Sequence, residues 1–284
     1  MAGCISFTAT RDRCFRFTFS NAGLKSATTD LGDGTIMHCG TTSSRTRRFN
    51  VYVPDLVFFG DSHTTRPERS EAFQAQCVAA LLLAHGLHTT SVVGISYGGF
   101  VAYSLAAQFP ELVEKVVLCC AGVCLEDKDL DEGMFQVKTV DEAVDILLPQ
   151  TPEKLRQLVQ IAFAMPVKAI PTCFLNDYIN VMCTENRQER KELIETLHKD
   201  RKLSNLPKIT QPTLIIWGEK DLVFPMELAY RLQRHLGENA RLVVIKNAGH
   251  ALNVQKPKEM YKNLKSFLID PTTPTVPKNQ SNGT

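Results

Sequence analysis

A chain of 284 residues with 44% hydrophobic residues is long enough for one large α/β domain with a buried core and an inserted subdomain. Its 32 basic and 30 acidic residues leave a net charge of +2. This balance gives no reason to expect nucleic acid or an anionic membrane as a partner. No apolar run approaches the roughly 18 residues that a transmembrane helix needs. The nine cysteines lie mostly in apolar stretches without paired zinc-ligand spacing, so we expect a reducing compartment and neither metal nor cofactor.

The first 29 residues are rich in Ser, Thr, Phe and Arg, and Asp12 is their single acidic residue. Organelle transit segments share this composition, but so do surface elements and disordered leaders, and both interpretations stay open. Because residues 1–7 are too short and mixed for a secretory signal, we expect a cytoplasmic protein, with an organelle reached through the leader as the alternative.

A hairpin is predicted at residues 30–39, with its turn at Gly32–Gly34. Residues 40–48 form a polar run without periodicity, and residues 49–55 then predict a strand. Residues 69–86 carry apolar side chains at helical spacing and predict an amphipathic helix.

Residues 90–107 combine a β-branched strand with an apolar helix, and Gly94-Ile95-Ser96-Tyr97-Gly98 lies at the joint. This G-x-S-x-G pattern is typical of a nucleophile elbow, in which a strained turn exposes the serine hydroxyl at a helix N-terminus. The positive end of that helix favours a developing oxyanion. We expect glycine at 94 and 98 because a side chain there would collide with neighbouring backbone. A serine placed by chance in a glycine-rich joint is the alternative, but the order of strand, elbow and helix favours Ser96 as nucleophile.

The rest of the chain alternates strands and helices around a helical block. Residues 116–121 predict another buried strand, and residues 124–206 are charged, punctuated by proline and without a convincing strand. The predicted elements after residue 124 are helices at 141–148, 152–163 and, in pieces, 175–203, then a strand at 212–217, a helix at 226–236, a strand at 241–246 and a helix at 257–268.

This alternation predicts an α/β fold, with a mainly parallel sheet covered by helices on both faces. The core comprises residues 30–123 and 207–270. Residues 124–206 form an inserted helical cap above the carboxyl ends of the strands, where such sheets bind ligands. The Pro-, Thr-, Asn- and Ser-rich tail at 271–284 predicts disorder.

A serine nucleophile needs a base and an orienting carboxylate. Of the seven histidines, two follow the carboxyl end of a strand, His63 loosely and His250 closely. We favour His250 because it comes last in the chain, as the order Ser, Asp, His requires. Asp221 follows the strand at 212–217 and fits the same order, whereas Glu219 is its nearest rival.

Three motifs together resemble the α/β-hydrolase superfamily: Gly94–Gly99, Gly218–Asp221 and Asn247–His250. The chain is similar to the cap-bearing serine hydrolases of plants, and through them to bacterial C–C bond hydrolases and monoacylglycerol-lipase-like esterases. The likeness extends over about residues 30–270. Epoxide hydrolases and haloalkane dehalogenases carry aspartate at the elbow, so Ser96 argues against their chemistry.

The resemblance implies a triad of Ser96, Asp221 and His250, with the backbone N–H of Tyr97 as an oxyanion donor. It implies a small apolar ester or related carbonyl substrate held under the cap. The motifs leave the substrate itself open, and a catalytically impaired, truncated variant that binds a ligand or a partner is the alternative function.

The chain departs from the superfamily before the strand Val51–Val53. Members carry there a strand that ends in His-Gly and then a helix, and the His-Gly loop supplies the second oxyanion donor. Here residues 40–48 alone join the hairpin to Val51–Val53, and His85-Gly86 lies before the elbow strand and cannot serve. A central strand, its loop and a helix are therefore missing, through alternative splicing or a gene-model error. Because open strand edges are costly, we expect Val51–Val53 to pair directly with the elbow strand, or a poorly folded chain.

Overall fold

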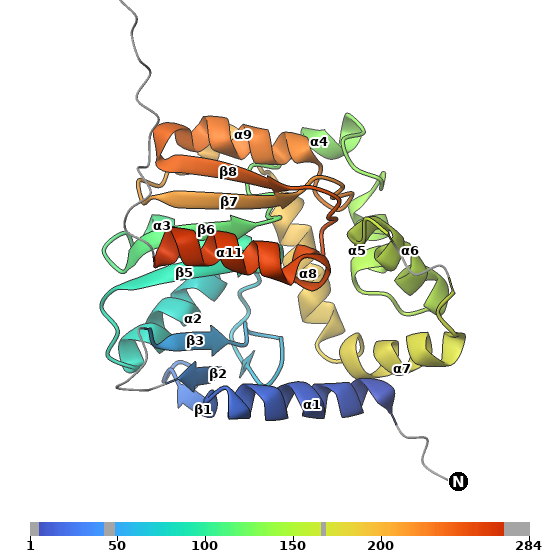
Figure 1. Cartoon of the computed structure of the whole chain (residues 1–284), viewed down its shortest axis with the longest axis horizontal. Helices are drawn as coiled ribbons and strands as arrows, with labels where there is room; N and C mark the ends of the chain where they lie inside the picture. The colour runs from blue at the N-terminus through green and yellow to red at the C-terminus, as the bar shows by residue number, and fades with distance from the viewer. Residues whose placement is uncertain (1–5, 43–48, 166–168, 270–284) are drawn as a thin grey trace, which may run out of the picture.

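The computed structural model describes residues 6–42, 49–165 and 169–269, and its strands form two separate sheets (Figure 1). The first sheet is antiparallel and is built by β1 (Lys25–Asp30), β2 (Thr35–Thr42), β3 (Val51–Pro54) and β4 (His63–Thr64). In it β2 lies between β1 and β3, and β4 also pairs with β2. The turn between β1 and β2 uses positive φ angles of 81° at Gly32 and 86° at Gly34, which confirms the predicted hairpin.

The second sheet is entirely parallel and has the strand order β5 (Thr90–Ile95), β6 (Val113–Cys119), β7 (Thr213–Gly218) and β8 (Ala240–Ile245). All six residues of β7 are buried, as its unbroken apolar run predicts for a central parallel strand. Figure 1 shows α11 (Pro257–Leu268) on the near face of this sheet, with α2 (Glu71–Ala84) and α3 (Tyr97–Gln108) on the far face. The α/β architecture with helices on both faces is therefore confirmed.

The prediction that Val51–Val53 pairs with the elbow strand is wrong. These residues form β3, which pairs with β2 in the antiparallel sheet, while β5 pairs with β6 in the parallel sheet. In the described ranges no pairing joins β3 to β5. The pairing with β2 holds β3 in place, because Thr42 is aligned with Val51 and Cys39 with Pro54. Moving β3 across to β5 would break these pairs.

Between β6 and β7, the described residues form helices and the loops that join them, with no strand. Their bounds are α4 (Lys128–Asp131), α5 (Val140–Leu147), α6 (Pro152–Ala162), α7 (Thr172–Met182), α8 (Arg187–His198) and the 3₁₀ turn Leu203–Asn205. The side chains of Thr139 and Thr151 cap α5 and α6 by accepting hydrogen bonds from Glu142 N and Lys154 N. Figure 1 shows this helical segment beyond the carboxyl ends of the parallel strands.

The remaining elements flank the two sheets. They are α1 (Phe7–Asn21), α9 (Met226–Leu236), the 3₁₀ turn Gly237–Asn239 and α10 (Leu252–Gln255). In the leader, α1 contacts α7 through a hydrogen bond from Thr8 N to Asp177 Oδ2 of 2.7 Å. The predicted disordered tail at 271–284 lies outside the described residues. Every helix of the described ranges is too short or too polar to cross a membrane.

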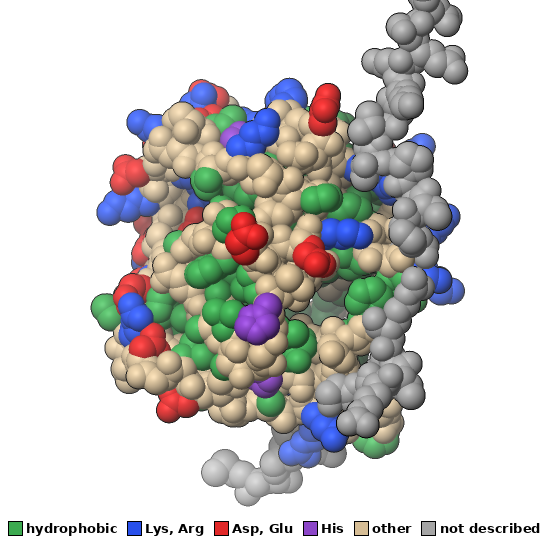
Figure 2. Space-filling model, turned by 90° about the vertical axis from the view of Figure 1, so that its left-hand side faces the viewer, with side chains coloured by type: hydrophobic (Ala, Val, Ile, Leu, Met, Phe, Trp, Pro, Cys, Tyr) green, Lys and Arg blue, Asp and Glu red, His purple; other side chains and the backbone are tan. Residues whose placement is uncertain are grey.

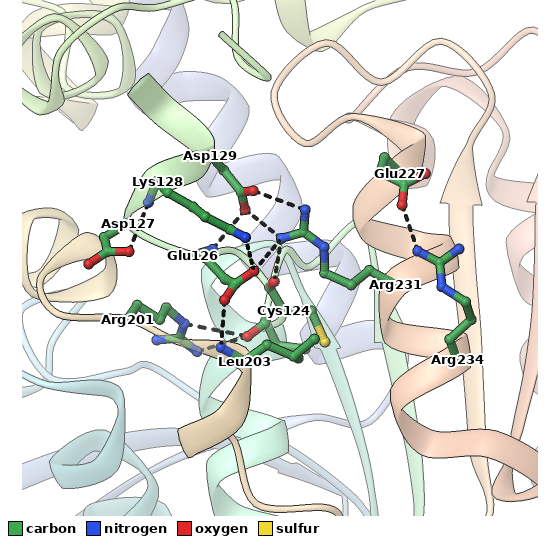
Figure 3. A network of polar contacts seen from close by, with 11 residues as sticks. Cys124, Glu126, Asp127, Lys128, Asp129, Arg201, Leu203, Glu227, Arg231 and Arg234 are labelled. Atoms are coloured by element: carbon green, nitrogen blue, oxygen red, sulfur yellow. Dashed lines mark hydrogen bonds and ion pairs between the residues drawn. The ribbon is translucent and has the colours of Figure 1, made fainter. Parts of the chain in front are cut away.

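A buried ion pair fastens the start of the helical segment to α9 (Figure 3). The Asp129 carboxylate accepts hydrogen bonds of 2.6 and 2.9 Å from the Arg231 guanidinium and one of 2.7 Å from Glu126 N. The Asp129 side chain is fully buried, and that of Arg231 is 14% exposed. The hydrogen bonds to Asp129 raise the pKa of Arg231, so its guanidinium stays charged. A second pair in the same view, Arg234 with Glu227, is exposed.

The Asp129→Ala variant is expected to lose about 3–5 kcal/mol of unfolding free energy, because it leaves the Arg231 charge buried without its main partner. The matched control is Glu227→Ala, which removes the exposed partner of Arg234 and should cost less than about 1 kcal/mol. Urea denaturation of the two variants measures the difference. Equal losses in both variants would contradict a structural role for the buried pair.

Candidate active site

Ser96 lies on a strained turn between β5 and α3, with φ 52° and ψ −123°, a conformation that side chains rarely adopt. Its backbone N–H donates to the carbonyl of Cys119 at 2.9 Å, which holds the turn against β6. A Cβ on Gly94 would lie 2.2 Å from the carbonyl oxygen of Gly98, so this glycine is required. The same expectation for Gly98 is wrong, because its Cβ position faces open space.

Ser96, His250 and Asp221 form one hydrogen-bonded chain. The Ser96 hydroxyl lies 2.9 Å from His250 Nε2, and His250 Nδ1 lies 2.9 Å from Asp221 Oδ2. The three residues follow the carboxyl ends of β5, β7 and β8, which meet at one edge of the parallel sheet. With the tautomer that carries a proton on Nδ1, Nε2 is free to accept the serine proton.

Backbone groups hold the Asp221 carboxylate in place in addition to its contact with His250. Its Oδ1 accepts hydrogen bonds of 2.9 Å from both Val223 N and Phe224 N, and its side chain is fully buried. The indole N–H of Trp217 donates to the Phe224 carbonyl at 2.9 Å and anchors the same loop. These donors and the imidazole fix the orientation of the buried carboxylate and satisfy its hydrogen-bonding capacity.

The loop that carries His250 is held by Gln255, which the sequence did not single out. The Oε1 atom of Gln255 accepts a hydrogen bond of 2.8 Å from Gly249 N. The backbone N–H of Ala251 donates to the carbonyl of Ala162 in α6 at 2.9 Å. In the sequence, the role of Gln255 is indicated only by its position six residues after Gly249. The contact of the loop with α6 joins distant parts of the chain and has no sequence signal.

The rival residues lie elsewhere. Glu219 accepts a hydrogen bond of 2.9 Å from Asn247 N and so supports the loop of His250. His63 is an exposed residue of the short strand β4.

A second hydrogen-bonded set joins Ser26, His38 and Asp55, with 2.6 Å from Ser26 Oγ to His38 Nε2 and 2.8 Å from His38 Nδ1 to Asp55 Oδ2. This set has the same residue types and contacts as Ser96, His250 and Asp221. Its serine, however, lies on β1 and has neither a strained turn nor a helix N-terminus.

Cys120 lies close enough to Asp221 and His250 for the three side chains to surround an ion. Metal binding requires a thiolate, but burial and the neighbouring Asp221 carboxylate raise the pKa of the Cys120 thiol well above its ordinary value. Asp221 and His250 are also already hydrogen-bonded to each other. This set therefore fits a proton relay better than a metal site.

The Tyr97 N–H opens α3 and, as the first helical residue, has no acceptor within its own helix. It is placed beside the Ser96 hydroxyl by the elbow itself. An N–H at a helix N-terminus can stabilise negative charge that develops on a carbonyl oxygen attacked by Ser96.

A cavity of about 270 Å³ adjoins Ser96. Its wall is almost entirely apolar, and much of it comes from α5 and α8, including Ile146 and Leu193. The core contributes Phe100 and Phe224. A cavity of this lining fits an acyl chain or an aromatic ring and offers few groups that could hold a charged ligand.

Two polar side chains of α8 also line the cavity, and no sequence motif marks either of them. The Arg190 guanidinium donates to the carbonyls of Phe58 and Met182 at 2.9 and 3.0 Å. Burial lowers the pKa of Arg190. His198 Nε2 is buried without a hydrogen-bond partner among the described residues.

A family profile described as the alpha/beta hydrolase fold matches residues 42–257. Among curated proteins, the chain is 29% identical over 184 residues to the monoacylglycerol lipase ABHD6 of Mus musculus, covering 62% of this chain and 54% of that protein. It is also 29% identical over 234 residues to an uncharacterised protein of Mycobacterium tuberculosis, covering 78% of this chain and 67% of that protein. The chain thus spans about half the length of the lipase that it matches.

Solved structures share the fold. A membrane phospholipase A, described as a bacterial virulence factor, superimposes with a TM-score of 0.73 at 24% identity, covering 94% of this chain and 93% of that one. An esterase of Exiguobacterium antarcticum gives a TM-score of 0.69 at 20% identity, covering 86% of this chain and 99% of the esterase. At these identities the similarity shows a common architecture.

Proposed function

Because the chain belongs to the α/β-hydrolase family, we propose that it is a serine hydrolase that cleaves esters with an apolar acyl group. The observation that carries this proposal is the hydrogen-bonded chain from Ser96 through His250 to Asp221, which starts at a strained elbow and adjoins an apolar cavity. This combination supplies a nucleophile, a base, an orienting carboxylate and a place for the substrate.

The geometry supports a two-step acyl transfer. Ser96 Oγ attacks the ester carbonyl carbon while His250 Nε2 takes its proton, and the Tyr97 N–H donates to the resulting oxyanion. His250 then gives the proton to the leaving alcohol, so the C–O bond breaks and an acyl-serine remains. Water attacks this intermediate with His250 again as base, which releases the acid and restores Ser96. Asp221 holds the imidazole and stabilises its charged form throughout.

The helices α4 to α8 act in this proposal as a cap over the site. Side chains from α5 and α8 line the cavity beside Ser96, so they would contact the acyl group. The similarity to a monoacylglycerol lipase and to esterases supports a small lipid or ester as substrate. An apolar cavity binds such an acyl group by removing its surface from water, worth about 0.8 kcal/mol per buried CH₂.

A fluorophosphonate probe tests the assignment of Ser96. The wild-type chain should be labelled covalently, and Ser96→Ala should not be labelled. The matched control is Ser26→Ala, which removes the serine of the second relay, at His38, and should leave labelling unchanged. Unlabelled wild type, or labelling that survives Ser96→Ala, would reject the proposal.

The open edge of β5 favours a second candidate, a catalytically impaired variant that binds a ligand or a partner. The strand that presents Ser96 is paired on one side only among the described residues, and a single oxyanion donor, Tyr97 N–H, is assigned. Loss of one such donor lowers kcat by about 10²–10³ in a protease. Probe labelling of Ser96 without sustained ester turnover would identify this variant, whereas turnover at rates usual for enzymes would exclude it.

A further inference from the structure

Between the facing edges of the two sheets lies a space in which the described part of the chain places no strand. Phe59, five residues after β3, and Ser96, directly after β5, line the same cavity, so both strands run toward it. Figure 1 shows β3 and β5 as the nearest strands of the two sheets, pointing in one direction. Figure 2 views the molecule from the left of Figure 1 and shows a hollow at a height between β5 and β3.

The backbone groups on the open edge of β5 can be identified from the pairing on its other side. Thr90 N donates to the carbonyl of Leu112 at 2.8 Å. Ser96 N donates to the carbonyl of Cys119 at 2.9 Å. Even-numbered residues therefore pair with β6, and odd-numbered residues point their N–H and C=O groups away from it. The residues that face the open edge are Ser91, Val93 and Ile95.

The same reasoning applies to β3. Asp55 N donates to the carbonyl of His38 at 2.9 Å, so the odd-numbered residues of this segment face β2. The N–H and C=O of Tyr52 therefore point toward the space between the sheets. Each sheet thus presents hydrogen-bonding backbone groups to this space, and unpaired groups of this kind are a template for another strand.

Three side chains beside these edges are apolar and exposed. Val51 and Val53 of β3 are 46% and 51% exposed, and Val93 of β5 is 43% exposed. No charged residue or proline in β5 protects its open edge. A strand laid between β3 and β5 would pair its side chains laterally with these valines and cover them.

We propose that the space between β3 and β5 is a binding slot for one extended segment of another polypeptide, about six residues long, apolar and β-branched. Two edges that offer backbone donors and acceptors at once need a ligand with a backbone on both sides, which an extended peptide supplies. Its side chains should be apolar because they would lie beside the exposed valines of β3 and β5.

Other occupants fit less well. A second copy of this chain would bring an edge strand that is already backed by its own sheet, which a slot between two sheets cannot admit. The carboxyl-terminal residues 271–284 contain three prolines, at 271, 274 and 277, and proline cannot donate to a strand ladder. A free strand of a separate polypeptide satisfies both edges.

The probe is the peptide acetyl-Lys-Thr-Val-Ile-Val-Thr-amide, carrying fluorescein on its lysine, and binding to the full chain is followed by anisotropy. The control peptide has the same sequence with alternate amides N-methylated, which removes donors from one edge. We expect the first peptide to bind and the control to bind at least about tenfold more weakly, since each lost hydrogen bond costs about 1 kcal/mol. Absence of binding, or equal binding of the two peptides, would overturn the proposal.

Amide hydrogen exchange locates the bound peptide. At a peptide concentration of about 100 times Kd, the amides of Ser91, Val93 and Tyr52 should exchange about 100-fold more slowly. The amides of Val92 and Gly94, which face β6, should be protected with and without peptide. Binding that leaves the three open-edge amides unprotected places the peptide elsewhere and rejects the slot. Protection of these amides in the free chain, including protection that grows with protein concentration, rejects it as well.

A variant adds a test on the protein side. Val93→Pro removes one N–H that faces the slot and none that pairs with β6, and proline is tolerated at such an edge position. It should weaken peptide binding at least about tenfold while the Val92 and Gly94 amides stay protected. Unchanged affinity in a folded Val93→Pro chain would contradict the slot. None of these measurements uses enzymatic turnover, so the slot and the hydrolase assignment fail or stand separately.

Discussion

Replacement of His250 by alanine is expected to lower kcat for ester hydrolysis by about 10⁶-fold, the scale seen when the base of a Ser-His-Asp triad is removed. The Ser96 hydroxyl lies 2.9 Å from His250 Nε2 and loses its proton acceptor in this variant. A serine hydroxyl without a base is a weak nucleophile at neutral pH. Hydrolysis of a short-chain p-nitrophenyl ester and fluorophosphonate labelling measure the loss, and labelling should fall together with turnover.

The matched control for this variant is His38→Ala. His38 contacts a serine and an aspartate at distances similar to those of His250, but it lies in the antiparallel sheet. If any hydrogen-bonded set of serine, histidine and aspartate could supply the activity, His38→Ala and His250→Ala would lower it to a comparable extent. We expect His38→Ala to retain the labelling and turnover of the wild type. A large loss there, or a small one in His250→Ala, would contradict the assignment of the base.

Exchange of Gly94 for alanine is expected to disrupt the elbow and lower kcat by at least about 10²-fold, the loss that a displacement of about 1 Å causes at a reacting group. The new Cβ would lie 2.2 Å from the carbonyl oxygen of Gly98 and 2.6 Å from Gly99 Cα. Both are backbone atoms, so relief requires movement of the turn that presents Ser96. The overpacking should also cost about 1–3 kcal/mol of unfolding free energy.

Gly98→Ala provides the comparison for Gly94→Ala. Outside its own helix, no heavy atom lies within 4 Å of a Cβ on Gly98, and its φ is not positive. Alanine also favours a helix over glycine by about 1 kcal/mol. This variant should therefore keep its activity and gain slightly in stability. Urea denaturation with parallel kinetics separates the two glycines, and similar losses in both would contradict the steric argument.

The sequence predicted those parts of the molecule that depend on local spacing. The order of strand, elbow and helix identified Ser96, and the positions of Asp221 and His250 after later strands followed from the parallel alternation. The buried run at β7 and the hairpin at Gly32–Gly34 were also readable, because both patterns are set by neighbours in the chain. The structure brings these three polar residues together as the spacing suggested.

Features that depend on distant contacts could not be predicted. The pairing of Val51–Val53 was misjudged because the cost of an open edge was weighed without the register of β2, which holds β3 in the antiparallel sheet. The predicted collision at Gly98 was wrong because the G-x-S-x-G motif does not reveal which of its two glycines has its Cβ position against backbone atoms. The contacts of Arg190 and Gln255 join residues of different elements, and no local pattern marks them.

The helix α2 joins two layers of structure that share no strand pairing in the described ranges. Its buried Gln74 exchanges hydrogen bonds of 2.8 and 2.9 Å with the backbone of Val57, just after β3. At its other end, His85 Nε2 lies 3.1 Å from the Thr29 hydroxyl of β1. Side-chain contacts of this kind transmit less cooperativity than a continuous hydrogen-bonded ladder. The two layers also share one hydrophobic core, to which Met37 and Cys39 of β2 belong together with residues of the parallel sheet. Helix α2 and this core, rather than a hydrogen-bonded ladder, therefore hold the antiparallel layer against the layer that carries Ser96.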